Sequence, residues 1–315
     1  MPNWKAKLIV CLFAVIFVLP TVVAAPTAVP SWTAANHEQG IFGGISLNVS
    51  HNATSVEITM GELPSIAEVY TATWCENCVP AEEGLMAAID ESGVDTTVLT
   101  FHRAIAEVED PFGVEDADYR WEDRYGDASA AVVGIKRAPP TMIINGEWLH
   151  AGSGGLEGEG LKPYYAESLA KEPMFSAQEG TSFLSWESND GANGTIEWAL
   201  NASTWLPSST TSILYVVEGA ATFEEGSNHL GVYHDVVRAM VELDGNSGSM
   251  QYTLPAAWDG ADLSLVLVHQ WDVQSEVMVE PSPDDGFLGL PAAGMLLIVV
   301  SIVGGALAAN PQRKE

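Results

Sequence analysis

Basic residues are scarce in this chain of 315 residues. Lysine and arginine together number 12 against 42 aspartates and glutamates, which gives a formal net charge of −30. Eight of the basic residues and 41 of the acidic ones lie between residues 26 and 286. A surface of this charge repels nucleic acid and anionic lipid headgroups, so binding to either is not expected. It is typical of a solvated surface adapted to high salt, where charges are screened over about 10 Å or less.

Cysteine is scarcer still, with three in the chain. Cys11 lies in an apolar N-terminal segment, which leaves Cys75 and Cys78 for the rest of the molecule. A zinc site needs three or four ligands, usually from two such pairs, and no second pair exists. A disulfide across two intervening residues closes too small a loop to add much stability. The pair therefore favours redox exchange, and we expect neither a metal nor a cofactor.

The two cysteines lie between a predicted strand and a predicted helix. The apolar, β-branched run Val69–Thr71 indicates a buried strand, and the stretch after Cys78 indicates a helix to about Ile89. Cys75 is then expected at the helix start, where unpaired N–H groups and the positive end of the dipole stabilise a thiolate. Two sulfurs in this geometry can close a small disulfide whose outer sulfur is open to a partner.

A second segment has the pattern of a hairpin. Residues 137–146, RAPPTMIING, predict a Pro-Pro-Thr entry into a short strand and an Asn-Gly turn, followed by a return strand over Glu147–His150. The order of strand, Trp-Cys-x-x-Cys helix, strand, crossover, Pro-Thr hairpin and closing helix is that of thioredoxins. Residues 63–172 thus resemble a thioredoxin-like α/β domain.

The closer likeness is to secreted thioredoxin-like proteins of the outer-membrane-protein-28 type. It is carried by Thr-x-Thr-Trp-Cys-x-x-Cys-x-Pro at residues 71–80 and by Asp110–Phe112 in the crossover. The resemblance implies that Cys75, after Trp74, is the attacking thiolate and that Cys78 resolves the mixed disulfide. It also implies that Pro140 takes the place of the cis-proline that faces the disulfide and pairs with an extended substrate strand.

One position departs from the family pattern. Thioredoxins carry a buried acid six residues before the first cysteine, but that position is Val69 here, and Glu68 is one residue off. On a strand, one residue means the opposite face. Either a β-bulge turns Glu68 inward, or another group or water moves the resolving thiol's proton. Glu76, between the cysteines, disfavours a thiolate. The cysteine pair should therefore be a more reducing couple than that of strongly oxidising relatives.

The crossover, residues 104–131, is long and charged. Arg120 and Arg124 share a helix face at a spacing of four residues, and they either shape a substrate groove or hold the acidic insertion together. His102, at the end of the strand Thr96–Phe101, is either a proton carrier near the site or a structural histidine.

The rest of the chain predicts export and a second, β-rich part. Residues 1–25 have the pattern of a signal peptide, and residues 26–62 form a polar lead-in. Residues 173–280 alternate as six or seven strands of an immunoglobulin-like β-sandwich without cysteine. Residues 287–309 carry no charge and predict a transmembrane helix, with residues 310–315 as a cytoplasmic tail. Four glycosylation acceptors, at Asn48, Asn52, Asn193 and Asn201, are consistent with an exported surface.

The fold class expected from the sequence is therefore an α/β thioredoxin-like domain, then an all-β immunoglobulin-like sandwich, then a C-terminal transmembrane helix. The function expected is that of a membrane-anchored extracellular thiol–disulfide oxidoreductase acting on secreted protein cysteines, with an electron donor in the membrane. The alternative is a non-enzymatic surface binding or adhesion module that uses the sandwich. A peroxide-reducing enzyme ranks last, because the Thr-x-x-Cys spacing is absent.

Overall fold

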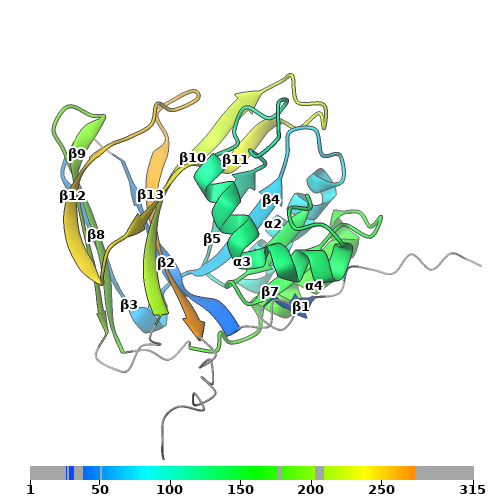
Figure 1. Cartoon of the computed structure of the whole chain (residues 1–315), viewed down its shortest axis with the longest axis horizontal. Helices are drawn as coiled ribbons and strands as arrows, with labels where there is room; N and C mark the ends of the chain where they lie inside the picture. The colour runs from blue at the N-terminus through cyan, green and yellow to red at the C-terminus, as the bar shows by residue number, and fades with distance from the viewer. Residues whose placement is uncertain are drawn as a thin grey trace, which may run out of the picture. The chain divides into compact units, whose positions relative to one another are not determined.

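Two β-sheets organise the chain in the computed structural model, which describes residue 26 and residues 28–31, 38–49, 52–175, 179–202 and 209–273. The larger sheet has nine strands (Figure 1). In spatial order they are β1 (Val29–Pro30), β7 (Trp148–Ala151), β6 (Thr141–Ile144), β4 (Ser65–Thr71), β5 (Thr96–His102), β11 (Gly231–Leu243), β10 (Ser209–Phe223), β13 (Leu263–Val273) and β2 (Glu38–Asn48). The smaller sheet contains β12 (Ser247–Thr253), β9 (Asn193–Ala202), β8 (Gly180–Ser188) and β3 (Thr54–Thr59).

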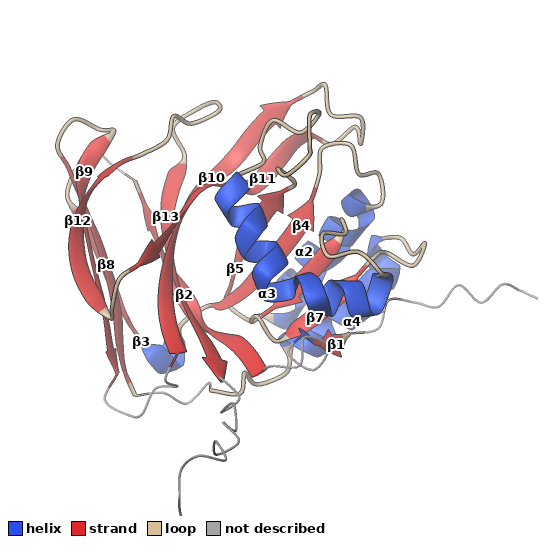
Figure 2. Ribbon diagram, in the orientation of Figure 1, coloured by secondary structure: helices blue, strands red, loops and turns tan. Residues whose placement is uncertain are grey.

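Three α-helices pack on the larger sheet within the described part of the chain (Figure 2): α2 (Cys78–Ser92), α3 (Glu115–Val133) and α4 (Gly158–Leu169). A short 3-10 turn, η2 (Met60–Glu62), leads from β3 towards β4. The helix α2 ends at Gly93, whose positive φ of 67° is a conformation that glycine adopts without a steric penalty. Strands account for more of the described residues than helices do.

The predicted fold class was wrong. In place of an α/β domain followed by a separate sandwich, one sheet crosses the boundary expected near residue 172. Strand β11, from the second half of the chain, pairs in parallel with β5 from the first half, with Val236 opposite Thr100. The reason the sequence misleads is physical: alternation of polar and apolar residues predicts that a segment is a strand, but not which strand it pairs with.

The lead-in also differs from expectation, because its segments are strands of both sheets. Strand β2 pairs with β13, and β3 pairs with β8. Strands β2 and β3 therefore belong with strands β8 to β13, which together we call the β-rich half, and the described residues all lie within one compact unit.

The membrane segments predicted from the sequence fall outside the described residues. This applies to the signal peptide at 1–25, the transmembrane helix at 287–309 and the tail at 310–315. Among the residues that the structure does describe, no helix combines the length and the apolar character needed to cross a membrane.

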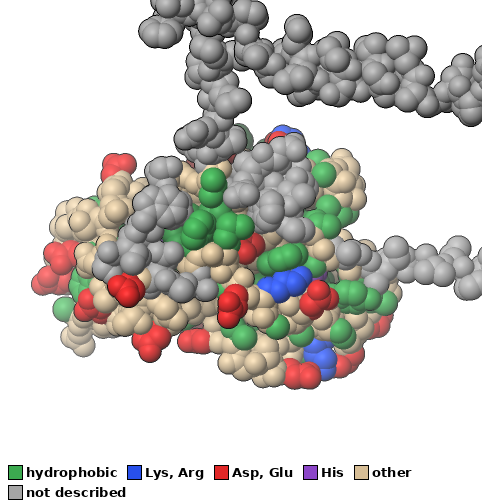
Figure 3. Space-filling view, turned by 90° about the horizontal axis from the view of Figure 1, so that it is seen from below, with side chains coloured by type: hydrophobic (Ala, Val, Ile, Leu, Met, Phe, Trp, Pro, Cys, Tyr) green, Lys and Arg blue, Asp and Glu red, His purple; other side chains and the backbone are tan. Residues whose placement is uncertain are grey.

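The two faces of the large sheet are covered by different elements. On one face, α3 packs across both halves of the sheet, in a cluster that includes Tyr70, Phe101, Trp121, Tyr215 and Val266. On the other face, α2 and α4 cover β4 and β6 through Val69, Leu85, Met142, Leu161 and Tyr165. The smaller sheet covers the strands at the β2 end through Ile45, Trp186, Ile196, Leu214 and Leu267. Acidic side chains are spread over the surface, as Figure 3 shows for one face.

A buried ion pair joins α3 to the sheet. Arg120 donates from Nη1 to Glu68 of β4 at 2.7 Å and from Nη2 to Gln270 of β13 at 3.0 Å. The Glu68 side chain is fully buried and the Arg120 side chain is 8 % exposed. A single residue of α3 thus connects the helix with strands of both halves.

Arg120→Ala should lower the free energy of unfolding by about 3–5 kcal/mol, because Glu68 would become an uncompensated buried charge. Urea denaturation of the variant and the unmodified chain at equal salt measures the difference. Lys162→Ala is the control, because Lys162 pairs with Glu91 and Glu159, whose side chains are mostly exposed, and the loss of such a surface ion pair should cost far less stability. Equal losses in the two variants would contradict the assignment of a buried, structural ion pair.

Candidate functional site

Cys75 and Cys78 form a disulfide at the junction between β4 and α2. The N–H of Cys75 donates to the carbonyl of Ala72 at 3.0 Å within a turn, and α2 begins three residues later, at Cys78. The sequence predicts the first cysteine at the helix start, whereas the helix begins at the second. Cys75 is 5 % exposed and Cys78 is fully buried. Both cysteines are therefore buried, and Cys75 alone keeps a small exposed fraction.

The segment between β5 and α3 holds the residues just before the disulfide. The indole N–H of Trp74 donates to Glu107 at 2.8 Å, and the backbone N–H of Thr73 donates to Oδ2 of Asp110 at 2.8 Å. Burial alone would raise the pKa of Glu107, but backbone N–H donors of its own loop and the Trp74 indole outweigh that effect and lower the pKa. An ionised carboxylate therefore anchors Trp74.

His102 reaches the same segment through Asp110. Its Nδ1 lies 2.8 Å from Asp110 Oδ2, and the ring packs edge-on against Phe112 and Tyr233. Its Nε2 is buried and has no hydrogen-bond partner within the described part of the chain. One ring nitrogen thus has a hydrogen-bond partner among the described residues and the other has none. This arrangement is compatible with both alternatives drawn from the sequence, a proton carrier near the site and a structural histidine. The Asp-Pro-Phe segment gains a physical role, because Asp110 binds the loop and Phe112 packs on the histidine.

The hairpin of β10 and β11 holds the same loop from another side. The backbone N–H of Asn228 donates to the carbonyl of Thr73 at 3.1 Å, and its Nδ2 donates to the carbonyl of Ala72 at 3.4 Å. Sequence reasoning did not single out Asn228, which is 156 residues from Ala72. No local sequence pattern predicts the contact of Asn228 with residues 72 and 73, because this contact depends on the long-range pairing of β11 with β5.

Pro140 lies at the entry to β6, and its peptide bond with Pro139 is cis, as the position predicts. Its carbonyl oxygen accepts the N–H of Gly152 at 2.8 Å, and proline has no N–H to donate. The contact with Gly152 ties Pro140 to the hairpin. The expectation that the Pro140 backbone binds a substrate strand gains no support from these contacts and stays a prediction.

Glu68 points away from the disulfide helix. Its carboxylate accepts hydrogen bonds from Arg120 and from the hydroxyl of Tyr125, both on α3, while Val69 packs with α2. Strand β4 pairs with β5 and β6 without a shift of register, so no bulge turns Glu68 inward. Of the two alternatives drawn from the sequence, this placement favours the one in which another group or water moves the proton.

Glu82 is a carboxyl group near the disulfide that sequence reasoning missed. It lies on α2, four residues after Cys78 and therefore on the same helix face. Its Oε1 accepts the hydroxyl of Thr71, the last residue of β4, at 2.6 Å. Burial raises the pKa of Glu82, although the hydrogen bond from Thr71 and the nearby His102 act against that rise. The spacing of four after the second cysteine is the signal that could have found it.

A cavity of about 220 Å³ opens beside Glu82, between α2 and strands β5 and β11. Its walls are mainly apolar, and Glu82, Glu83, His234 and Asp235 are its ionisable lining residues. His234 is exposed. The cavity gives the Glu82 carboxyl a route to solvent that does not pass the disulfide.

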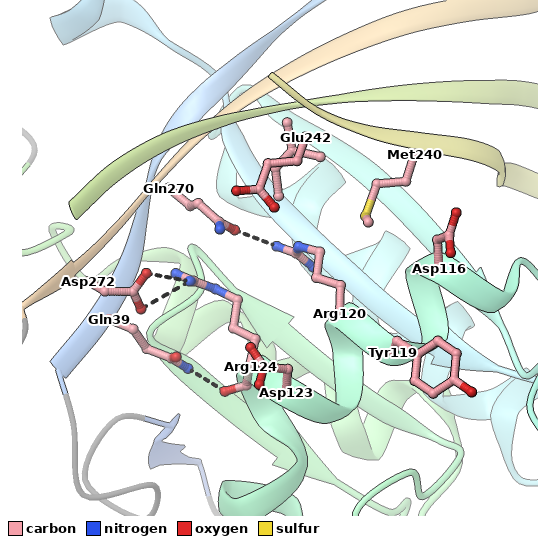
Figure 4. Close-up of a pocket in the computed structure, with 11 residues that line it drawn as sticks. Gln39, Asp116, Tyr119, Arg120, Asp123, Arg124, Met240, Glu242, Gln270 and Asp272 are labelled. Carbon is pink, nitrogen blue, oxygen red and sulfur yellow. Dashed lines mark hydrogen bonds and ion pairs between the residues drawn. The ribbon is translucent and has the colours of Figure 1, made fainter. Parts of the chain in front are cut away.

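A larger cavity of about 650 Å³ lies between α3 and the sheet, lined by Arg120 and Arg124 (Figure 4). Arg124 pairs with Asp272 at 3.2 Å and donates to the carbonyl of Gly40 at 2.8 Å. Arg120 is paired with Glu68 and Gln270. Both guanidinium groups thus connect α3 to the sheet, which favours the structural alternative over the groove-shaping one.

No family model and no curated protein matches this chain. A solved structure from Agrobacterium tumefaciens is 14 % identical, with a TM-score of 0.36 over 60 % of this chain and 78 % of that one. HBP35 of Porphyromonas gingivalis is 15 % identical, with a TM-score of 0.39 over 73 % of this chain and 80 % of that one. Likeness at this level carries no argument about fold or function, so the resemblance to secreted thioredoxin-like proteins stays a prediction.

Proposed function

We propose that this protein is a thiol–disulfide oxidoreductase that exchanges disulfides with cysteines of other proteins. The observation that carries the proposal is the position of the Cys75–Cys78 pair: the two sulfurs join at a strand–helix junction, where Cys75 keeps 5 % exposure and Cys78 is fully buried. A structural disulfide closing so short a loop would stabilise little. A dithiol that exchanges needs this asymmetry between an accessible sulfur and a shielded one.

The proposed reaction balances without a cofactor. In the reduced protein, the Cys75 thiolate attacks one sulfur of a client disulfide, and the client's other sulfur leaves as a thiolate that takes a proton from water. Cys78 then loses its proton and attacks Cys75 of the mixed disulfide, which restores the Cys75–Cys78 disulfide and releases the second client thiol. Two electrons pass from the protein's dithiol to the client, and a dithiol donor must return the protein to its reduced form.

Glu82 is the group that we assign to accept the proton of Cys78. It follows Cys78 on the same face of α2, and its hydrogen bond from Thr71 fixes one carboxylate oxygen. A general base is most effective when its pKa lies near the working pH, and burial moves the pKa of Glu82 upward, in that direction. The adjoining cavity lets the proton leave to solvent.

Export is part of the proposal, because stable protein disulfides, which are the substrates of such exchange, form and persist in oxidising compartments. The four asparagines of the glycosylation acceptors, Asn48, Asn52, Asn193 and Asn201, are all exposed. An extracellular position on the cell surface is thus consistent with the described residues, while the segments predicted to direct it lie outside them.

A second candidate is a binding module in which the disulfide is only structural. The observation in its favour is the small exposure of Cys75, which is 5 %. A cavity of about 610 Å³ on the β-rich half, lined by Leu254, Pro255 and Leu263 among others, would be its binding surface. The two candidates differ in whether Cys75 forms a covalent adduct with other proteins.

Cys78→Ser should trap a mixed disulfide between Cys75 and client proteins, because the resolving thiol is gone while the attacking one remains. Cys75→Ser should trap nothing, since Cys78 is fully buried. Non-reducing electrophoresis of cells that express each variant, followed by reduction of any adduct, makes the comparison. If Cys78→Ser forms no adduct and the purified protein leaves protein disulfides intact, the binding module is the correct alternative.

Glu82→Gln should slow the closing of the Cys75–Cys78 disulfide from the mixed disulfide by about 100-fold, the low end of the usual contribution of a general base. In the unmodified chain, the rate should rise with pH as the Glu82 carboxyl loses its proton. In the variant, the rise should move to the higher pH at which the Cys78 thiol ionises by itself. Stopped-flow kinetics of client release measure both.

Asp90→Asn is the matched control, because Asp90 is an exposed acid on the same helix, lies outside the cavity beside Glu82 and loses the same charge. Its pH–rate profile should match that of the unmodified chain. Equal slowing in both variants would show a general effect of negative charge, and the assignment of Glu82 would then be wrong.

A further inference from the structure

The turn between β10 and β11 makes contacts that the exchange chemistry described above does not use. Two N–H groups of Asn228 donate to two consecutive carbonyls just before the disulfide, and the Tyr233 hydroxyl lies close to one of these carbonyls. The N–H of Asn228 lies 3.1 Å from the Thr73 carbonyl, Nδ2 of Asn228 lies 3.4 Å from the Ala72 carbonyl, and the Tyr233 hydroxyl lies 3.4 Å from the Thr73 carbonyl. Asn228 is 8 % exposed and Tyr233 is 2 % exposed. Water is thus largely excluded from the contacts between the hairpin and these two carbonyls.

The orientation of the Asn228 amide follows from its other partners. Its Oδ1 accepts the Leu230 N–H at 3.1 Å and the Tyr233 hydroxyl at 2.7 Å. Two donors on one side of the amide require the oxygen there, which leaves the NH₂ group to face Ala72. A tyrosine has a single hydroxyl proton, and the shorter distance assigns it to Asn228. Tyr233 therefore acts mainly by holding the amide.

Close approach of the hairpin depends on Gly226. A Cβ at this position would lie 2.1 Å from the Tyr233 hydroxyl and 3.0 Å from the Thr73 carbonyl oxygen. Any side chain would therefore push the turn away from the loop. The fit of the hairpin against residues 72 and 73 is a feature of several residues of the turn, not of Asn228 alone.

The Ala72 carbonyl is shared between the hairpin and the disulfide. It accepts the Cys75 N–H at 3.0 Å and the Asn228 Nδ2–H at 3.4 Å. A carbonyl oxygen carries partial negative charge, which opposes a thiolate nearby, and each N–H that faces it offsets part of that charge. The effect is strengthened by burial, because the local dielectric is low.

We propose that Asn228 is a positioning residue for Cys75: it fixes the Ala72 and Thr73 carbonyls and thereby favours the reactive thiolate. The proposal rests on the oxidoreductase function above, and it makes the β-rich half part of the redox site. Other charged groups also surround this loop, and their charges are the same in the variants below: Glu76 in the turn, Glu82 on α2, Glu107, Asp110 and His102 on the β5 side, and Glu224 and Glu225 in the hairpin.

The test is the pH dependence of alkylation of Cys75 by iodoacetamide. The full chain carrying Cys11→Ser and Cys78→Ser leaves Cys75 as its single thiol. Asn228→Ala in this background should raise the midpoint of the profile, so that alkylation below the midpoint slows about threefold, or about half a pKa unit. Asn228→Asp should raise it further, because a carboxylate oxygen would face the Ala72 carbonyl.

Two further variants keep the result interpretable. Tyr233→Phe retains the ring and should shift the midpoint in the same direction by a smaller amount, which covers the case in which the Asn228 variants do not fold. Ser227→Ala, at an exposed neighbour in the same turn, should leave the profile unchanged. An unmoved midpoint in the Asn228 and Tyr233 variants overturns the proposal. So does a faster plateau with the same midpoint, because the hairpin would then merely cover the thiol.

Alkylation needs no client, so failure of this proposal can be told from failure of the proposed function. A shifted midpoint in a chain that forms no client adduct supports the role of Asn228 and refutes the exchange function. Client adducts together with an unmoved midpoint refute the role of Asn228 alone.

Discussion

The pairing of β11 with β5 is the constraint on which the rest of the structure depends. It joins Val236, which is fully buried, to Thr100 in the middle of the large sheet. Because a strand pair fixes both register and direction, this contact sets where the β10–β11 hairpin ends. The hairpin therefore arrives at residues 72 and 73 as a consequence of sheet pairing, and a break in this pairing would separate the β-rich half from the disulfide.

The loop before the disulfide is held by groups of opposite kinds on its different sides. Carboxylates of Glu107 and Asp110 accept its N–H groups, while the amide of Asn228 donates to its carbonyls. The Thr73 N–H and the carbonyls of Ala72 and Thr73 thus each find the partner that their own chemistry requires, as buried backbone groups should. An exchange site built on such a loop has a defined geometry without metal or cofactor, since the reacting sulfurs belong to the chain itself.

Local features of this structure could be predicted from the sequence, whereas pairings could not. The strand before Cys75, the helix after Cys78, the hairpin at Pro140 and the cis bond there follow from periodicity, turn residues and the resemblance. Because side chains alternate along a strand, Glu68 is also expected on the face opposite Val69, and it lies there. The joined sheet, the strands of the lead-in and the contacts of Asn228 depend on partners more than a hundred residues away, which no local pattern specifies. The position of Glu82 near the cysteine pair could also have been predicted, because Glu82 follows Cys78 by four residues and this spacing places both on one face of a helix.

The central claim is that Cys75 and Cys78 are an exchange pair and not a structural link. The reduction potential of this pair, measured in the purified protein against glutathione and dithiothreitol buffers, tests it most directly. We expect a value between about −180 and −270 mV, the range of moderate to reducing dithiol catalysts, because Glu76 opposes the thiolate while the N–H donors of the loop support it. A value below about −300 mV, typical of structural disulfides, would contradict the claim.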